Sequence, residues 1–287
     1  MLMSMIRFPT LRWLVLAACG VAQLAAQNQQ NKQKQDNNRP FPPHRVMGNV
    51  YYVGSETLAT FLITTPEGHI LINSDYEATV PVIRAGVEKL GFKFTDIKIL
   101  LGSHAHGDHM EGDALVKELT AARVMAMEQD VAALRLMRPG NKPHPIDRVL
   151  KDREEVQLAS TTLVARLTPG HTKGCTTWTM KVQEAGRTYD LAIVCSVGVN
   201  ANFVLVYNRD YPQIADDYRS SFKTLRALPV DVFLGAHGNF YNLAEKFPKI
   251  GPGTNPFIDP AGYRAYVDRM EESFNARLEE QRKAAAK

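Results

Sequence analysis

A run of metal-capable side chains at residues 104–109 constrains this chain more than any other stretch. The run has the sequence His-Ala-His-Gly-Asp-His, whereas the whole chain of 287 residues contains only 8 histidines. Neutral imidazoles and a carboxylate are ligands that suit Zn²⁺ and other divalent transition metals. We therefore predict a metal site here, because a surface loop would rarely gather so many histidines by chance.

The sequence around this run places it at the carboxyl end of a buried strand. Residues 96–101 form a short apolar stretch with polar borders, which is typical of such a strand, and residues 112–119 begin a predicted helix. Loops that leave the carboxyl ends of strands carry the chemistry of many α/β proteins. The run is therefore expected on a loop where functional groups gather.

The spacing within the run predicts two adjacent sites rather than one. Side chains alternate between two faces in an extended segment, so His104, His106 and Asp108 can point the same way. His109 breaks the alternation and points elsewhere. We assign His104 and His106 to a first site, and Asp108 and His109 to a second.

The remaining hydrophobic pattern runs through strands and then helices twice. In the first half it predicts strands at 46–53, 58–64, 69–73 and 123–127 and helices at 78–90 and 129–136. In the second half it predicts strands at 156–158, 162–167, 176–182, 189–195 and 230–235 and helices at 211–228 and 263–282. Two sheets packed face to face with helices outside would bury this pattern, which predicts an α+β fold.

The N-terminus has the pattern of a secretion signal, expected at residues 1–26. Residues 1–12 carry two arginines and no acidic residue, and residues 13–20 are apolar but too few to span a bilayer. The segment ending at Cys19 resembles a bacterial lipoprotein box, with Cys19 as the lipid-carrying first residue. Ala25 and Ala26 offer an ordinary cleavage site instead, and an uncleaved membrane anchor is the third alternative. We expect an exported, periplasmic protein that reaches a membrane only if Cys19 carries a lipid.

Residues 27–43 are rich in Gln, Asn, Lys and Pro and contain almost no apolar side chains. Such a composition buries too little surface to order itself, so we expect a disordered tether or a disordered mature N-terminus. The folded domain is then expected at residues 44–287. At 45% hydrophobic residues it can fill a substantial core.

Two more histidines follow predicted strands in the second half. His171 and His237 each lie beside glycines, which let the backbone approach a crowded centre. Three histidine-bearing strand exits in one chain favour a shared site. We expect His144, in a loop rich in Pro and Gly, to be a solvated loop histidine, and we expect the same of His44 and His69 at strand edges.

The motifs at residues 104–109, 170–174 and 235–238 resemble those of the metallo-β-lactamase superfamily, and the resemblance spans residues 44 to about 280. It implies a four-layer αββα sandwich with a site at one edge of the two sheets. Many hydrolases of this fold carry a metal-bridging aspartate at the strand end after residue 192, but this chain has no acid between Asp190 and Asp210. That pattern is similar to the one in the subclass B3 metallo-β-lactamases.

The resemblance implies a ligand set for two Zn²⁺ ions. One ion would be held by His104, His106 and His171, and the other by Asp108, His109 and His237. Subclass B3 enzymes hydrolyse the β-lactam amide bond of penicillins, cephalosporins and carbapenems with a metal-bound hydroxide, which gives antibiotic resistance. Asp108 would orient the nucleophile as a catalytic residue.

Substrate binding is implied less completely. Ser196, together with Asn200 or Asn202, would help bind the substrate carboxylate, while strand-end capping is an equal alternative for the two asparagines. The subclass often has a second hydroxyl two residues after Ser196, where this chain has Gly198.

Two cysteines remain after Cys19. Cys175 and Cys195 fall on adjacent predicted strands, and some subclass members carry a disulfide there. We expect this disulfide, with two buried free thiols as the alternative. Cys195 is not expected to be a metal ligand, because the resemblance puts Ser196 at the position where one β-lactamase group uses cysteine.

The expected partner is a small β-lactam molecule, and the chain is expected to be a monomer. The net charge of +4 is small and forms no basic stripe with interleaved aromatic residues, so no nucleic-acid partner is expected. One alternative is another hydrolase of the same fold that acts on lactones or thioesters. The other is a zinc-binding protein or surface lipoprotein without enzymatic activity.

Overall fold

The computed structural model describes residues 39–286. The expected signal at residues 1–26, Cys19 within it and most of the expected tether lie outside the described residues. No helix in the described part of the chain has the length and apolar character needed to cross a membrane.

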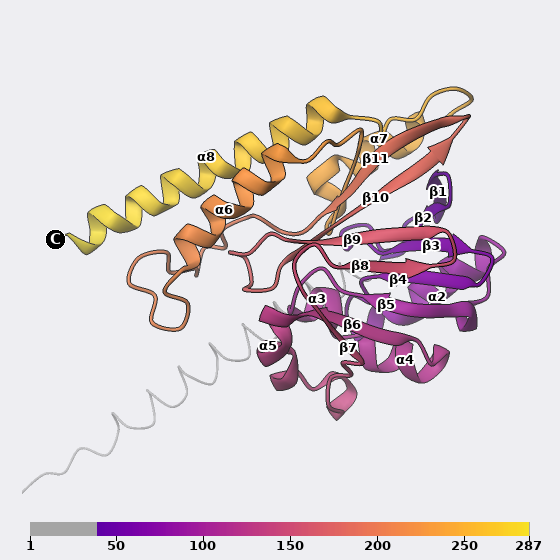
Figure 1. The fold of residues 1–287 in the computed structure, drawn as a ribbon, viewed down its shortest axis with the longest axis horizontal. Coiled ribbons are helices and arrows are strands. Elements are labelled where there is room, and N and C mark those ends of the chain that lie inside the picture. The colour runs from indigo at the N-terminus through magenta and orange to yellow at the C-terminus, as the bar shows by residue number, and fades with distance from the viewer. Residues whose placement is uncertain (1–38, 287) are drawn as a thin grey trace, which may run out of the picture. The chain divides into compact units, whose positions relative to one another are not determined.

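Two β-sheets form the inner layers of the fold (Figure 1). The first sheet has seven strands in the order of the chain: β1 (His44–Met47), β2 (Val50–Tyr52), β3 (Phe61–Thr65), β4 (Gly68–Ile72), β5 (Ile97–Leu101), β6 (Arg123–Met127) and β7 (Arg148–Leu150). The second has five strands in the order β12 (Val232–Gly235), β11 (Arg187–Val194), β10 (Thr176–Glu184), β9 (Thr161–Leu167) and β8 (Glu155–Leu158).

Helices cover the outer face of each sheet (Figure 1). The first sheet carries α2 (Val80–Lys89) and α4 (Asp113–Thr120), and the second carries α6 (Ile214–Ala227) and the long α8 (Pro260–Ala285). Shorter helices are α3 (Gly107–Met110), α5 (Val131–Leu136) and α7 (Leu243–Lys246). Single 3₁₀ turns occur at Glu77–Thr79, Phe94–Asp96, Glu128–Asp130, Pro139–Asn141, Gly238–Tyr241 and Phe247–Lys249. The four layers confirm the expected α+β sandwich.

The alternation of side chains along the strands produces two hydrophobic layers. In β4, Ile70 and Ile72 pack into the core between the sheets, whereas Leu71 faces the opposite way. Leu71 packs in the layer that contains Ile83 and Val87 of α2. A strand that is buried on both faces is therefore apolar at every position, as expected for the centre of a sandwich.

Parallel pairing brings several strand exits to one edge of each sheet. In the first sheet, β4, β5 and β6 pair in parallel, so the segments that follow them leave from the same edge. In the second sheet, β11 and β12 also pair in parallel. The loop that begins at Gly102 and the segment that begins at Ala236 can therefore meet, because each continues from a carboxyl end.

Three expectations about the elements are wrong in detail. Residues 46–53 do not form one strand, since the chain turns at Gly48 (φ 52°) and the antiparallel pair β1 and β2 results. The loop after residue 138 ends in β7, which pairs with β6 and was not predicted. The compact unit begins at Pro40 rather than His44, because the Phe41 ring packs edge-on against Tyr52.

Candidate metal centre

Three imidazoles from two loops converge at the shared edge of the sheets. The β5 loop carries His104 and His106, and the loop between β9 and β10 carries His171. Each of these histidines offers a ring nitrogen, and the three nitrogens lie within 4.8 Å of one another. We refer to His104, His106 and His171 as the three-histidine group.

A second set of side chains lies beside the first. Nε2 of His109 is 3.1 Å from Nε2 of His237. Oδ2 of Asp108 lies 3.4 Å from Nε2 of His109 and 3.7 Å from Nε2 of His237. Ligand atoms that bind one Zn²⁺ tetrahedrally are separated by roughly 3.3 Å, given bonds of about 2.0–2.1 Å. Asp108, His109 and His237, which we call the aspartate group, therefore fit a single ion.

The outward nitrogens of several histidines have hydrogen-bond partners, which orients the rings. Nδ1 of His171 donates to the carbonyl oxygen of Gly198 at 2.9 Å, and Nδ1 of His104 lies 3.1 Å from Oγ of Ser103. Nε2 of His104 is buried and has no partner. A buried nitrogen without a partner costs free energy unless something binds it. Both rings thus present Nε2 to the centre.

Burial favours the neutral form of the imidazoles of His104, His109 and His171. Desolvation, together with the neighbouring imidazoles, lowers the pKa of His109 to about 3 and that of His171 to about 4. The pKa of His104 is also well below its usual value, chiefly because the ring is buried. Burial alone would raise the pKa of Asp108, but the imidazoles of His109 and His237 hold it below its usual value. Neutral imidazole and ionised carboxylate are the forms that bind metals.

The other histidines of the described chain lie apart from the centre, but the expectation that they are solvated is wrong for two of them. His144 is 7% exposed, and its Nε2 lies 3.1 Å from Oδ2 of Asp113. His69 is also 7% exposed, because its ring packs edge-on against Phe92. His44 is partly buried and stacks on Tyr52.

A cleft of about 560 Å³ opens beside the three-histidine group. Among the expected substrate contacts, Asn202 lines it, whereas Ser196 is buried and the exposed Asn200 is not part of the lining. The rest of the lining comes mainly from the segment before α6: Phe203, Val204, Tyr207, Asn208, Arg209, Asp210, Tyr211 and Ile214. No pattern in the sequence assigned this segment to the site.

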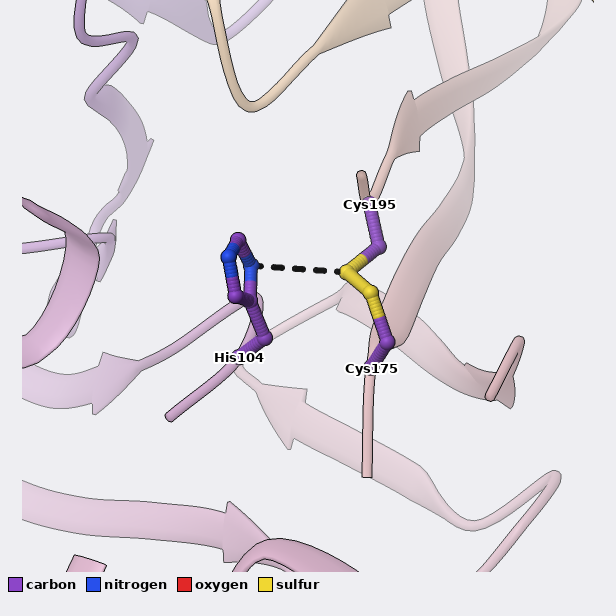
Figure 2. Close-up of side chains that lie close together, drawn as sticks. All are labelled: His104, Cys175 and Cys195. Carbon is purple, nitrogen blue, oxygen red and sulfur yellow. Dashed lines mark hydrogen bonds between the residues drawn. A yellow bond between two sulfur atoms is a disulfide. The ribbon is translucent and has the colours of Figure 1, made fainter. Parts of the chain in front are cut away.

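A disulfide lies directly behind the centre. Cys175, before β10, and Cys195, after β11, are joined, and their Cα atoms are 5.9 Å apart. Sγ of Cys195 lies 3.6 Å from Nδ1 of His104 (Figure 2). With its sulfur in this bond, Cys195 has no thiolate to offer a metal.

The fold and the two ligand groups define a metalloprotein of the αββα class. A family model described as the metallo-β-lactamase superfamily matches residues 56–237. The chain belongs to the metallo-β-lactamase superfamily, and the resemblance predicted from the motifs is confirmed.

Solved structures of subclass B3 are similar over most of the chain. The native FEZ-1 metallo-β-lactamase from Legionella gormanii is 46% identical, with a TM-score of 0.81, and the match covers 85% of this chain and 98% of that chain. BJP-1, a subclass B3 metallo-β-lactamase of Bradyrhizobium japonicum, is 35% identical, with a TM-score of 0.81. The match covers 88% of this chain and 99% of that chain. A hydroxyacylglutathione hydrolase of Methylococcus capsulatus is 27% identical over 212 residues, which are 74% of this chain and 72% of that protein.

Proposed function

We propose that this protein is a zinc-dependent hydrolase of the β-lactam amide bond and that it gives its producer resistance to penicillins, cephalosporins and carbapenems. The observation that carries the proposal is the aspartate group, whose three ligand atoms are spaced as one tetrahedral ion requires, directly beside a second group of three histidines. The likeness to subclass B3 enzymes across most of the chain supports the choice of substrate.

Each ligand group would hold one Zn²⁺. His104, His106 and His171 would hold the first ion through their ring nitrogens, and Asp108, His109 and His237 would hold the second. Zinc at these positions would supply a water of lowered pKa and a Lewis acid for the lactam carbonyl. Asp108 would orient the attacking water, because its carboxylate is partly exposed at the centre and held in the ionised form.

The cleft supports a small-molecule substrate. Its volume of about 560 Å³ lies within the range that drug-sized ligands occupy. We assign substrate contacts to Ser196, Asn200 and Asn202, of which Asn202 is already in the lining. Contacts of the other two residues with a substrate carboxylate would require the segment after β11 to adjust.

The decisive experiment is a hydrolysis panel on the purified protein with a penicillin, a cephalosporin and a carbapenem. Turnover should disappear when a chelator removes the metal and should return when Zn²⁺ is added. Activity that survives complete removal of metal, or absence of turnover in the zinc-loaded protein for all three substrates, would contradict the proposal.

A thioester hydrolase is the second candidate, and the curated relative from Methylococcus capsulatus favours it. The absence of any acid between Asp190 and Asp210 argues against it, since the bridging aspartate expected of such hydrolases has no counterpart there. A hydroxyacyl glutathione thioester and a lactone, added to the same panel, separate the two candidates by their kcat/KM values.

We also propose that the mature protein acts as a monomer in the periplasm, attached to a membrane only if Cys19 carries a lipid. Fractionation of cells that express the wild type and Cys19→Ala tests this. Release of both proteins with the soluble periplasm would exclude the lipid, and size-exclusion chromatography would report the oligomeric state.

A further inference from the structure

We propose that two separate buried carboxylates position the two halves of the metal centre, Asp130 for the three-histidine group and Asp113 for the aspartate group. The inference rests on the proposed metal binding, and it concerns residues outside the ligand set. It follows that metal affinity can be lowered at either group while the other group keeps its affinity.

Asp130 joins the two loops that carry the three-histidine group. Its Oδ2 accepts hydrogen bonds from the backbone N–H of Ala105 and from Oγ1 of Thr172, both at 2.8 Å. Its Oδ1 accepts from the backbone N–H of Gly174 at 2.7 Å. Ala105 lies between the two histidines of the first loop, and Thr172 directly follows His171. One carboxylate therefore sets the distance between the two loops.

The surroundings of Asp130 are built for this contact. The residue is 3% exposed, and burial raises the pKa of its carboxyl although its three hydrogen bonds act in the opposite direction. A Cβ atom on Gly174 would come within 2.6 Å of Cγ of Asp130. The close approach therefore requires glycine at this position. Hydrogen bonds to an ionised carboxylate are about twice as strong as those between neutral groups. Asp130 therefore holds the two loops firmly at a fixed distance.

Asp113 contacts residues that hold the backbone of the aspartate group. Oγ of Ser74 donates to Oδ1 of Asp113 at 2.6 Å, and Nε2 of His144 lies 3.1 Å from Oδ2. The same Nε2 lies 3.3 Å from the carbonyl oxygen of Met110, and the backbone N–H of Ser74 donates to the carbonyl oxygen of His109 at 3.0 Å. The carbonyl oxygen of Met110 is the hydrogen-bond partner of this Nε2, and Oδ2 of Asp113 lies within ion-pair distance of it.

The contacts of Asp113 reach the aspartate group through the backbone. His109 belongs to that group and Asp108 precedes it, so holding the carbonyl oxygens of residues 109 and 110 orients both side chains. Ser74 and Asp113 are fully buried, and His144 nearly so. Removing one member of such a network leaves the others unsatisfied.

The two networks have no member in common among the described residues. Asp130 bonds to residues 105, 172 and 174, whereas Asp113 contacts residues 74 and 144. Because the networks share no partner, we expect a substitution in one of them to leave the other unchanged. Substituting a residue that positions a metal ligand typically lowers metal affinity about 10–100-fold.

The test is a Co²⁺ titration of the metal-free full chain, read by visible absorption. Variants His171→Ala and His237→Ala, each lacking one ligand of one group, provide the reference spectrum of the remaining site. Asp130→Asn should weaken the three-histidine site about 10–100-fold and leave the other within about threefold, and Asp113→Asn should do the reverse. Each variant is thus the other's control.

Two milder variants keep the test usable if a carboxylate variant fails to fold. Thr172→Val removes one bond to Asp130, and His144→Gln removes one contact of Asp113. His69→Gln is the matched control for the latter, since both histidines are 7% exposed and His69 packs against Phe92. At the aspartate group, His69→Gln should bind cobalt as tightly as the wild type, and His144→Gln should bind it more weakly than both.

The outcomes separate this inference from the proposed function. If the wild type binds two Co²⁺ ions but the variants weaken both sites alike, or neither site, the separate positioning roles are excluded and the metal centre stands. If the wild type binds no Co²⁺, the proposed function and this inference both fall. In the metal-free protein, faster amide hydrogen exchange at Ala105 and Gly174 in Asp130→Asn supplies a readout independent of metal.

Discussion

Nε2 of His109 lies 3.1 Å from Nε2 of His237, although 128 residues separate them in the chain. The first follows a strand of the seven-stranded sheet and the second a strand of the five-stranded sheet. An isolated bridge between Leu58 and His237 joins the segment before β3 to the segment after β12 at this point. The relative placement of the sheets therefore sets the spacing of two proposed ligands.

The first prediction concerns His237→Ala. The variant should bind about one zinc ion per chain instead of two, and β-lactam turnover should fall by at least about 100-fold, since even residues behind the ligands change affinity or activity by up to that factor. Elemental analysis of the dialysed protein and initial-rate assays measure the two effects. His69→Ala, which lies away from the centre, is the control, and an unchanged zinc content in His237→Ala would remove this residue from the ligand set.

The second prediction concerns the layer between α2 and the first sheet. Leu71 is fully buried there, so Leu71→Ala should lower the free energy of unfolding by about 2–5 kcal/mol. Leu136 is 82% exposed, and Leu136→Ala should change it by less than about 0.5 kcal/mol. Urea denaturation followed by circular dichroism measures both values. Equal effects would mean that Leu71 is not packed as described.

The third prediction concerns the contact between Gly174 and Asp130. An added Cβ would lie 2.6 Å from both Cγ and the backbone nitrogen of Asp130, so Gly174→Ala should destabilise the fold by about 1–3 kcal/mol. At Gly251 a Cβ would meet nothing within 4 Å, so Gly251→Ala is the matched control. Thermal unfolding of the two variants gives the comparison, and a Gly174→Ala protein as stable as Gly251→Ala would contradict the close approach.

The fourth prediction concerns the disulfide. Cys175 and Cys195 are separated by 20 residues, and closing a loop of that length stabilises the native state by about 3 kcal/mol in the chain-entropy model. The double variant Cys175→Ser/Cys195→Ser should lose about that much unfolding free energy in denaturant titrations. Reductant should lower the stability of the wild type and leave the double variant unchanged. A count of two free thiols in the unreduced folded domain would exclude the bond.

Much of the local structure follows from the order of residues alone. The strand Arg123–Met127 was predicted with its observed bounds, because an apolar run between polar residues has few other solutions. The same reasoning placed the residue 104–109 run after a buried strand, where the structure has it. Both conclusions depend on neighbours within a few residues, which a single sequence displays.

Features that depend on distant partners were missed or misjudged. His144 was expected to be solvated because its loop is polar, yet Asp113, from α4, draws it into the interior. Asp130 had no signal of its own, since it lies at the start of the helix predicted at 129–136, where an acidic residue is ordinary. Its three hydrogen bonds cross 25, 42 and 44 residues, and they exist only because β5 and β6 pair in parallel and the second sheet packs against the first.

The sequence by itself therefore determined the fold class, the family and the residue types available for a metal. Only the tertiary structure decided which of those residues meet, how far apart their nitrogens lie and which buried carboxylates hold their loops. The physical reason is that strand and helix patterns arise from local periodicity, whereas a binding centre needs distances of a few ångströms between segments that only sheet register and packing bring together.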